Sequence, residues 1–369
     1  MAASTGVVWN HGGATARLAR PAYPRVVNGE SPAYRYLAAV LEALVAEGLG
    51  EGSEVVIMHV DTGFGREVAE GAAVAAGRLG LLSRSVSFRP GRASDVLAQV
   101  PTADVLLSAG SFDDDVAIAQ RDGEHRWRAV GLVAAGVDEL RHAISDRVEG
   151  LYGPCQWFDD ETDDPADGPS SEWFSQRYRD VNGAEPPYPA AAAFAAGVLW
   201  QRCAEEAGTV ESLPVRAASQ RLDTTTLFGR FRVDPITGVQ TGHQIRVVQW
   251  RSGKRVLVSN LGLGTGERGL ICSRRYDSTS DENRAYFRKP RLAFVVLVAL
   301  DNGDPVNASI DRKLGSRGKC SVERRCDIIG PKDPYSVLGF AQGAEGREEA
   351  VKCAAHRMWI QKVQEIWDL

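Results

Sequence analysis

The clearest pattern of hydrophobic and polar positions lies between residues 54 and 80. Residues 54–60 read Glu-Val-Val-Ile-Met-His-Val, an almost unbroken apolar run that is typical of a strand buried on both faces of a parallel sheet. Residues 61–65, Asp-Thr-Gly-Phe-Gly, have the composition of a turn in which two glycines permit positive φ. An Ala-rich helical stripe runs from residue 66, and Gly80 suits its end. The loop follows the carboxyl end of the strand, where small ligands bind in open α/β sheets.

The same alternation of strand and helix continues along the chain. The apolar spacing predicts strands at 6–9, 25–28, 82–88, 104–108, 129–133, 148–152, 228–234, 235–238, 243–250 and 255–258, and helices at 31–48, 94–100, 113–120, 140–144, 171–181 and 189–207. We expect Ser31 to cap the helix that begins at Pro32. Repeated alternation with short loops predicts an α/β protein with a doubly wound parallel sheet.

Composition limits the class of protein. The 369 residues have room for two or three domains. The net charge of −5 argues against a nucleic-acid partner. Charge is uneven, because the chain is acidic up to about residue 260 and basic beyond it. The longest apolar run, 292–300, is much shorter than the ~20 residues of a spanning helix, so no membrane insertion is expected.

The six cysteines form no Cys-x-x-Cys pair, so we expect buried free thiols. Cys320 and Cys326, followed by Cys353 and His356, leave a metal site as an alternative, although the spacing is not that of a zinc finger. The first residues lack a basic stretch and an apolar stretch, so the sequence predicts no signal peptide at its start.

Several segments, taken in order, resemble a known family. Val-Val-Trp-Asn-His-Gly-Gly at 7–13 and Asp-Thr-Gly-Phe-Gly at 61–65 are two of them. The others are 103–107, 148–150, 173–178, 186–191, 228–238, 247–250 and 253–254. Together they resemble the type I periplasmic-binding-protein fold, and more narrowly the leucine-type (branched-chain amino acid) substrate-binding proteins of ABC transporters.

The resemblance implies two α/β lobes that are joined by three crossings and close on a small ligand. Lobe I would comprise residues 1–50 and 155–240, lobe II would comprise 51–153 and 241–258, and the crossings would fall near 49–53, 153–157 and 240–245. Family members have a further βαβα stretch before the first strand seen here, so lobe I is expected to be incomplete. Residues 259–369 match nothing in the family and stay unassigned.

On lobe I the resemblance points to the loop after the first strand. Asn10, His11, Gly12, Gly13 and Ala14 correspond to the loop that contacts the ligand in the family. Glycines there allow the backbone to approach a ligand carboxylate closely. A plain turn between a strand and the next element is the alternative.

On lobe II the first two candidate loops follow strands 54–60 and 104–108. Phe64 corresponds to an aromatic residue that often covers the ligand, and Asp61 and Thr62 share its loop; the alternative for Phe64 is a core position. Ser111 and Phe112 lie at the same rim, next to carboxylates at 113–115 that could meet an ammonium group or serve only as charges at a helix start.

The remaining candidates follow the strand at 129–133 and the second crossing. Gly136 and Asp138 lie where the family often has an acidic residue for a ligand ammonium group, and Glu139 is the alternative to Asp138. Gln156 and Trp157 at the second crossing are expected to wall the cleft, and packing at the hinge is the alternative for Trp157.

The sequence therefore predicts a non-catalytic protein that binds a small polar solute, such as an amino acid or an amide, without a cofactor. Its partners would be this ligand and, if the protein is exported, an ABC transporter permease. The family location is periplasmic or extracellular. A cytoplasmic ligand sensor of the same fold is the alternative, since no signal peptide is predicted. A nucleotide-dependent enzyme that uses Gly264 to Gly269 is a weaker alternative, because no helix pattern follows that Gly-x-Gly-x-x-Gly segment.

Overall fold

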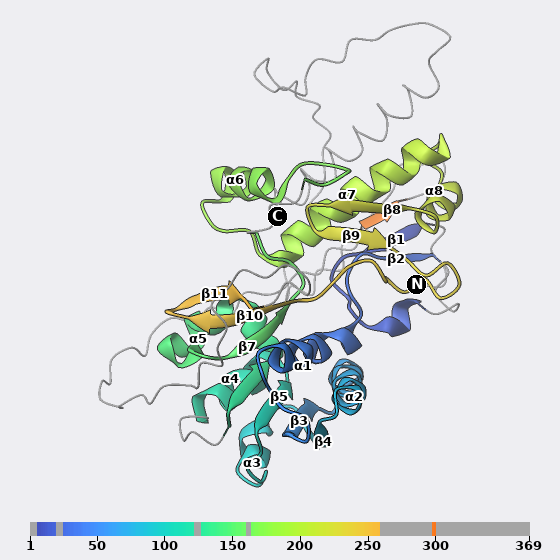
Figure 1. Ribbon diagram of the computed structural model, residues 1–369. Helices are drawn as coiled ribbons and strands as arrows, with labels where there is room; N and C mark the ends of the chain where they lie inside the picture. Colours follow the sequence, from blue (N-terminus) through green and yellow to red (C-terminus); the bar gives the residue numbers. More distant parts are fainter. Residues whose placement is uncertain (1–5, 20–24, 122–126, 160–163, 259–296, 300–369) are drawn as a thin grey trace, which may run out of the picture.

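The computed structural model describes residues 6–19, 25–121, 127–159, 164–258 and 297–299 (Figure 1). The helices are α1 (Tyr36–Ala46), α2 (Gly63–Arg78), α3 (Ala93–Leu97), α4 (Phe112–Arg121), α5 (Glu139–Ile144), α6 (Ser171–Asn182), α7 (Tyr188–Ala207) and α8 (Ser212–Ser219). The strands are β1 (Val7–Asn10), β2 (Val26–Asn28), β3 (Glu54–Val60), β4 (Leu82–Phe88), β5 (Val105–Ala109), β6 (Ala129–Leu132), β7 (Tyr152–Cys155), β8 (Asp223–Thr226), β9 (Gly229–Arg232), β10 (Arg246–Arg251), β11 (Lys254–Leu257) and β12 (Leu297–Ala299). Short 3₁₀ helices lie at Ala16–Ala19, Ala33–Arg35, Val133–Gly136 and Ser145–Val148.

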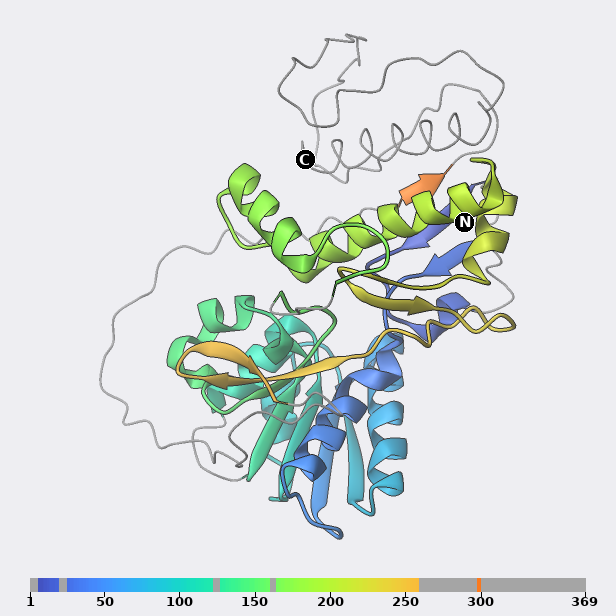
Figure 2. The same ribbon diagram turned by 45° about the horizontal axis from the view of Figure 1, so that its top comes forward.

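These elements gather around two sets of hydrophobic cores, which we call the large body and the small body. The large body holds a seven-stranded sheet in the order β11-β10-β7-β6-β5-β3-β4. Helices α1 and α2 cover one face, and α3, α4 and α5 cover the other, as Figure 2 shows with the strands between the two helix layers. Strand β3 is buried on both faces: Val55 and Ile57 join one core, and Val56 and Met58 join the other.

The sequence predicts a wholly parallel sheet, but the sheet of the large body is mixed. Strands β4, β3, β5, β6 and β7 are parallel, but β10 runs antiparallel to β7, and β11 runs antiparallel to β10. Ser252 and Gly253 both have positive φ in the turn between β10 and β11. A two-residue turn of this kind joins antiparallel strands.

Helix α2 begins earlier than its apolar stripe indicates. The side chain of Thr62 caps it by accepting a hydrogen bond from the Gly65 backbone N–H at 3.1 Å, so Gly63, Phe64 and Gly65 are helical. Neither glycine has positive φ, which corrects the expected reason for their presence. A Cβ at Gly65 would overlap the carbonyl oxygen of Val60. The glycine is therefore required by the close approach of helix and strand.

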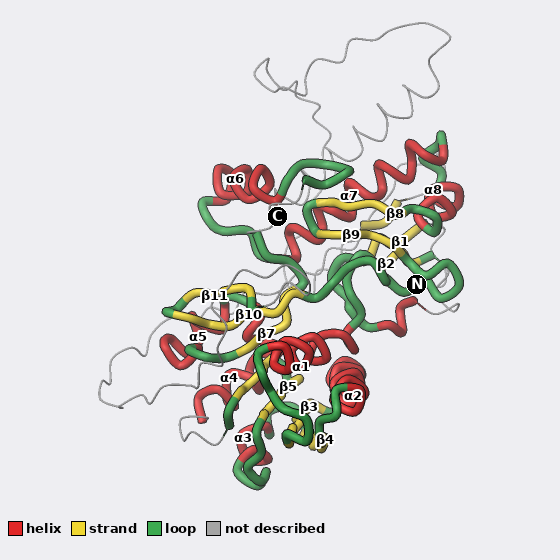
Figure 3. Tube along the Cα trace, viewed as in Figure 1, coloured by secondary structure: helices red, strands yellow, loops and turns green. Residues whose placement is uncertain are grey.

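The small body contains the sheet β12-β1-β2, the hairpin β8-β9 and helices α6, α7 and α8 (Figure 3). Its cores are built on the inner face of α7, where Leu199 and Trp200 meet Trp9 of β1 and Phe231 of β9. Strand β2 pairs parallel with β1, and β12 pairs antiparallel with it.

The packing of α1 differs from the expected division of the chain. The sequence analysis assigned residues 1–50 to lobe I, but the buried face of α1, including Leu37 and Leu41, lies in the core with β3, α2 and β5. The first passage between the cores therefore lies near residue 30 and not at 49–53. Ser31 does not cap this helix: Pro32 precedes the 3₁₀ helix Ala33–Arg35, no side chain provides a cap, and α1 follows directly.

Other elements shift or were missed. The strand expected at 148–152 lies at β7, and residues 235–237 form a turn instead of a strand. Neither α8 nor β8 was expected from the sequence. Among the described residues, no helix is long and apolar enough to cross a membrane.

Two glycines of α2 provide a test of the helix–strand approach. We expect Gly65→Ala to lower the free energy of unfolding by about 2–3 kcal/mol, because the new methyl group has no space beside Val60. Gly77→Ala should raise it by about 0.5–1 kcal/mol, because nothing lies within 4 Å of its Cβ position and alanine favours the helix. Urea unfolding of both variants measures the difference, and equal effects would contradict the packing at Gly65.

Candidate functional site

The chain passes between the two bodies at three places, and buried polar side chains bind these passages together. Gln156, which follows β7, donates from Nε2 to the Ser31 carbonyl at 3.0 Å and to Tyr36 Oη at 2.9 Å. Its Oε1 accepts a hydrogen bond from Ser31 N at 3.2 Å. Gln156 is 4% exposed and Ser31 is fully buried. One glutamine amide therefore joins the first passage to the second.

The third passage is joined by His243 and Gln240. Ser31 Oγ donates to the His243 carbonyl at 2.9 Å and lies 2.8 Å from His243 Nδ1. Gln240 Nε2 donates to the Gly29 carbonyl at 3.2 Å, and its Oε1 accepts from Gly242 N at 2.9 Å. Burial lowers the pKa of His243 to about 4, so its ring is neutral at pH 7. We call Ser31, Tyr36, Gln156, Gln240 and His243 the junction cluster.

Glu30 lies directly beside the junction cluster and is buried there. It is 4% exposed, and its Oε1 has no hydrogen-bond partner among the described residues. Burial raises the pKa of Glu30 to about 7. Burial and then the nearby Glu30 raise the pKa values of Tyr36 in the large body and Tyr188 in the small body. Glu30 therefore lies close to both bodies.

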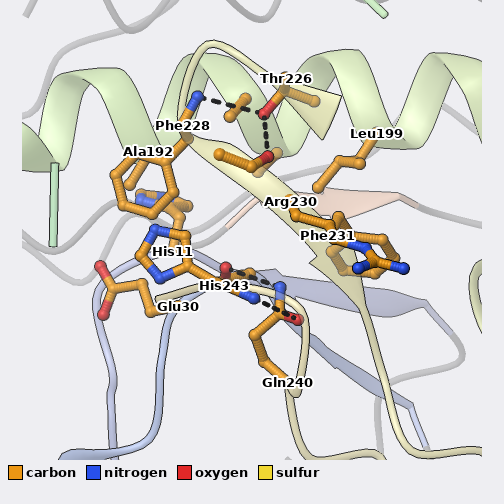
Figure 4. A pocket seen from close by; sticks show the side chains of 14 residues that line it. His11, Glu30, Ala192, Leu199, Thr226, Phe228, Arg230, Phe231, Gln240 and His243 are labelled. Atoms are coloured by element: carbon orange, nitrogen blue, oxygen red, sulfur yellow. Dashed lines mark hydrogen bonds between the residues drawn. The ribbon is translucent and has the colours of Figure 1, made fainter. Parts of the chain in front are cut away.

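A small cavity opens beside Glu30 (Figure 4). Phe228 and Phe231 of the β8–β9 hairpin, the Ala192 to Leu199 side of α7, and His11, Gln240 and His243 line it together with Glu30. The ring of Phe228 stacks on His243 with 4.8 Å between centroids. The space for the centres of water-sized molecules is about 10 Å³, which is enough for about one water molecule or one ammonium group. The cavity wall is thus mostly apolar and aromatic, with one carboxylate and with Arg230, whose guanidinium pairs with Asp223.

The predicted lobe I loop reaches this cavity through His11 alone. Asn10 uses its amide within the loop: Oδ1 accepts from Gly13 N at 3.0 Å, and Nδ2 donates to Asn28 Oδ1 at 2.9 Å. Gly12 N also points to Asn10 Oδ1, at 3.4 Å. The glycine N–H groups that were expected to meet a ligand carboxylate are therefore bonded to Asn10. Ala14 packs against the core of the large body.

The predicted residues after β3 lie at the expected edge of the sheet but not in the cavity. Asp61 forms an exposed ion pair with Arg66, and Thr62 caps α2. Phe64 is half-buried and meets Tyr36 edge to face, with 5.7 Å between ring centroids. This contact favours the core alternative for Phe64 and joins it to the junction cluster through Tyr36.

The carboxylates after β5 mostly bond to their own segment. Asp115 is fully buried and accepts hydrogen bonds from Ser108 Oγ at 2.7 Å and Ala134 N at 2.9 Å, and burial raises its pKa to about 7. Ser111 Oγ donates to Asp114 at 2.7 Å. Phe112 is exposed. Asp114 and Asp115 therefore connect strand ends to α4 through these hydrogen bonds.

The last three predicted residues have structural partners as well. Arg255 donates to both oxygens of Asp138, at 2.7 and 2.6 Å, and to the Gly136 carbonyl at 2.7 Å. This bidentate pair corrects the expected role of Asp138 towards an ammonium group. Trp157 is buried in the small body, where Nε1 donates to the Leu227 carbonyl at 2.9 Å.

Sequence reasoning missed Glu30, Phe228, Gln240 and His243 as site residues. A weak signal for Glu30 exists, because it lies two residues after strand 25–28, at the end of the strand where ligands bind in α/β sheets. The next two residues, Ser31 and Pro32, have the pattern of a helix start, which hides the acid before them. Gln240 and His243 lie in a segment without any periodic pattern.

The alternatives for the C-terminal region fall outside the described residues. These are the Gly264–Gly269 segment and the possible metal ligands Cys320, Cys326, Cys353 and His356. Within the described ranges, no three His, Cys, Asp or Glu side chains are grouped so that they could hold a metal ion.

Two α/β bodies that meet at three chain passages, with a cavity beside them, define a bilobal ligand-binding protein. A family model described as periplasmic binding protein matches residues 5–255, so the chain belongs to the periplasmic binding protein family. This family consists of non-catalytic periplasmic solute-binding proteins. A search among curated protein sequences gives no match.

Solved structures of the same fold include binding proteins with different ligands. The leucine-binding protein LivK of Thermotoga maritima is 15% identical, with 68% of this chain and 71% of that chain covered and a TM-score of 0.56. A branched-chain amino acid ABC transporter protein of Thermus thermophilus with bound valine is 17% identical, with 67% and 70% covered and a TM-score of 0.52. A solute-binding protein of R. palustris in complex with benzoate is 13% identical, with 71% and 73% covered and a TM-score of 0.56. These likenesses establish the fold.

The junction cluster can be tested through Gln156. We expect Gln156→Leu to lower the free energy of unfolding by roughly 2–4 kcal/mol, because it leaves buried groups of Ser31 and Tyr36 without partners. Gln176→Leu is the control, because this exposed glutamine of α6 bonds to the side chains of Asp180 and Arg179 on its own helix and should change stability by less than about 0.5 kcal/mol. Urea unfolding compares the two, and a small effect at Gln156 would contradict the role of the cluster.

Glu30 predicts an unusual dependence of stability on pH. Because its folded pKa of about 7 exceeds the ordinary value of 4.5, the charged form costs folding free energy above pH 4.5, and the full cost is reached above pH 7. We therefore expect Glu30→Gln to raise the free energy of unfolding at pH 8 by up to about 3 kcal/mol and to change it little at pH 4. Thermal and urea unfolding at the two pH values measure this. A variant that is less stable than the native protein at pH 8 would show that Glu30 is already compensated.

Proposed function

We propose that the protein binds a small solute through a positively charged amino group that Glu30 holds at the junction of the two bodies. A buried carboxylate without a partner is costly, and a bound cation would compensate its charge. The observation that carries the proposal is the buried Glu30 Oε1 without a partner beside a cavity large enough for an ammonium group.

The walls of the cavity support a ligand with an apolar part next to its amino group. Phe228 and the alanine face of α7 provide apolar contact, while Gln240 and His243 are already bonded within the junction cluster. Small-molecule sites are commonly of this kind, with an apolar lining and a few placed polar groups. An amino acid or an amine with a hydrocarbon side chain fits this chemistry. The bulk of such a ligand would lie between the bodies, which would act as the two lobes of the family.

The ligands named for the structural relatives fall into two classes that Glu30 would treat differently. Leucine and valine carry an ammonium group, whereas benzoate carries only a carboxylate. An anionic ligand beside Glu30 would meet a like charge in a region of low dielectric. The proposal therefore favours the amino acid class over aromatic acids. Delivery of this ligand to an ABC transporter permease follows from the family and is part of the proposal.

Matched pairs of ligands test this by isothermal titration calorimetry. Leucine and valine are compared with their deaminated acids, and benzoate is included. We expect binding of the amino compounds and at least tenfold weaker binding of the acids without an amino group, which corresponds to about 1.4 kcal/mol.

Two variants locate the amino group. Glu30→Gln should weaken binding of the amino compounds by about tenfold to a hundredfold, because a charged hydrogen bond is lost. Asp113→Asn is the control, since Asp113 is an exposed carboxylate at the start of α4 that was also a candidate for an ammonium group, and it should leave the affinity unchanged. A larger loss at Asp113 than at Glu30, or preferred binding of benzoate, would overturn the proposal.

A further inference from the structure

The loop residues that follow β1, at positions 11–16, leave the small body and lie against the large one. Among them, Ala14 packs against the core that α1, α2 and β3 share. The carbonyl of Ala14 accepts a hydrogen bond from Ala33 N at 2.6 Å. Ala14, four residues after the end of β1 in the small body, therefore contributes to the packing of the large body. This contact joins the bodies without being one of the three chain passages.

Glu67 on α2 holds the same loop by two hydrogen bonds. Thr15 Oγ1 donates to Glu67 Oε2 at 2.7 Å, and Ala16 N donates to Oε1 at 2.8 Å. Thr15 Oγ1 also accepts a hydrogen bond from Arg17 N at 3.3 Å. Hydrogen bonds to a carboxylate are about twice as strong as those between neutral groups. Both oxygens of Glu67 therefore bind across the gap between the bodies.

The contact lies close to the candidate site. The loop that Glu67 holds begins with Asn10 and contains His11, which lines the cavity beside Glu30. At its other end, the guanidinium of Arg17 lies 3.7 Å from the position that a Cβ of Gly63 would occupy, at the start of α2. The loop thus connects the cavity wall with the first turn of α2, and a change in its position would move His11.

We propose that Glu67 is a positioning residue that fixes loop 11–16 across the junction and holds the two bodies in their binding arrangement without touching the ligand. The effect on ligand affinity rests on the function proposed above, whereas the effect on the arrangement of the bodies does not. Without these two bonds, the three passages and the Ala14 contact would restrain the bodies less tightly, and the unliganded protein would sample more open arrangements.

Small-angle X-ray scattering of the ligand-free full chain tests the arrangement of the bodies. We expect Glu67→Ala to increase the radius of gyration relative to the native protein. Thr15→Val, which removes one of the two bonds and keeps the size of the side chain, should give a smaller increase in the same direction. Glu70→Ala is the control, because Glu70 is exposed on the same helix three residues further on, and it should leave the scattering unchanged.

Hydrogen–deuterium exchange and ligand binding complete the test. Glu67→Ala should speed exchange at Ala16 and also in the junction segments around Ser31 and Gln240, and should weaken ligand affinity by about tenfold with a faster dissociation rate. Faster exchange at Ala16 alone, with unchanged scattering, would overturn the proposal and leave Glu67 as a local contact. If the native protein binds no amino compound, the proposed function fails, and scattering and exchange still decide the role of Glu67.

Discussion

The arrangement of this protein depends on one buried amide. Gln156 bonds to the backbone of Ser31 in both directions and to the hydroxyl of Tyr36, and Ser31 extends the bonds to His243. Without them, three separate pieces of chain would cross between the bodies with buried polar groups unsatisfied. Because every one of these groups has its partner inside the junction, the crossing segments can be buried, and the cavity beside them has a defined wall.

Against this satisfied network, Glu30 stands out because its carboxylate is buried next to it without a full set of partners. Proteins rarely bury such a group without a reason, since the cost is several kcal/mol unless a charge or hydrogen-bond donor approaches. The adjacent Gln240 and His243 do not supply one, as they bind the backbone and Ser31. A ligand amino group would supply the missing charge, and it would do so at the point where both bodies meet. Binding and the relative position of the bodies are then coupled through the same few residues.

The fold was largely predictable from the sequence because burial on two faces leaves a clear pattern. The apolar run of β3 and the Ala-rich stripe of α2 predict the central strand and a covering helix of the large body. The family match over residues 5–255 confirms the resemblance. The boundary near residue 50 was wrong because the apolar face of α1 shows that it packs on a sheet but not on which of two sheets. The direction of β10 also required knowledge of which strand lies beside it.

The candidate site was harder to predict, since polar residues at strand ends look alike whether they bind a ligand or a neighbouring backbone. Asp138 and Asn10 have the residue types expected of ligand contacts, yet Arg255 and the loop backbone occupy them. Glu30 became visible only when the folded chain showed that nothing pairs with its Oε1. Gln240 and His243 lie beside Glu30 in the fold, although they are more than 200 residues away from it in the sequence.

The most direct test of the account counts the protons that leave the protein when an amino ligand binds. Calorimetric titrations at pH 6 in buffers of different ionisation enthalpy measure this number, because Glu30 with a pKa of about 7 is mostly protonated at that pH and must lose its proton to pair with an ammonium group. We expect the native protein to release close to one proton per ligand and Glu30→Gln to release none. Binding without proton release, or the same release by both proteins, would contradict it.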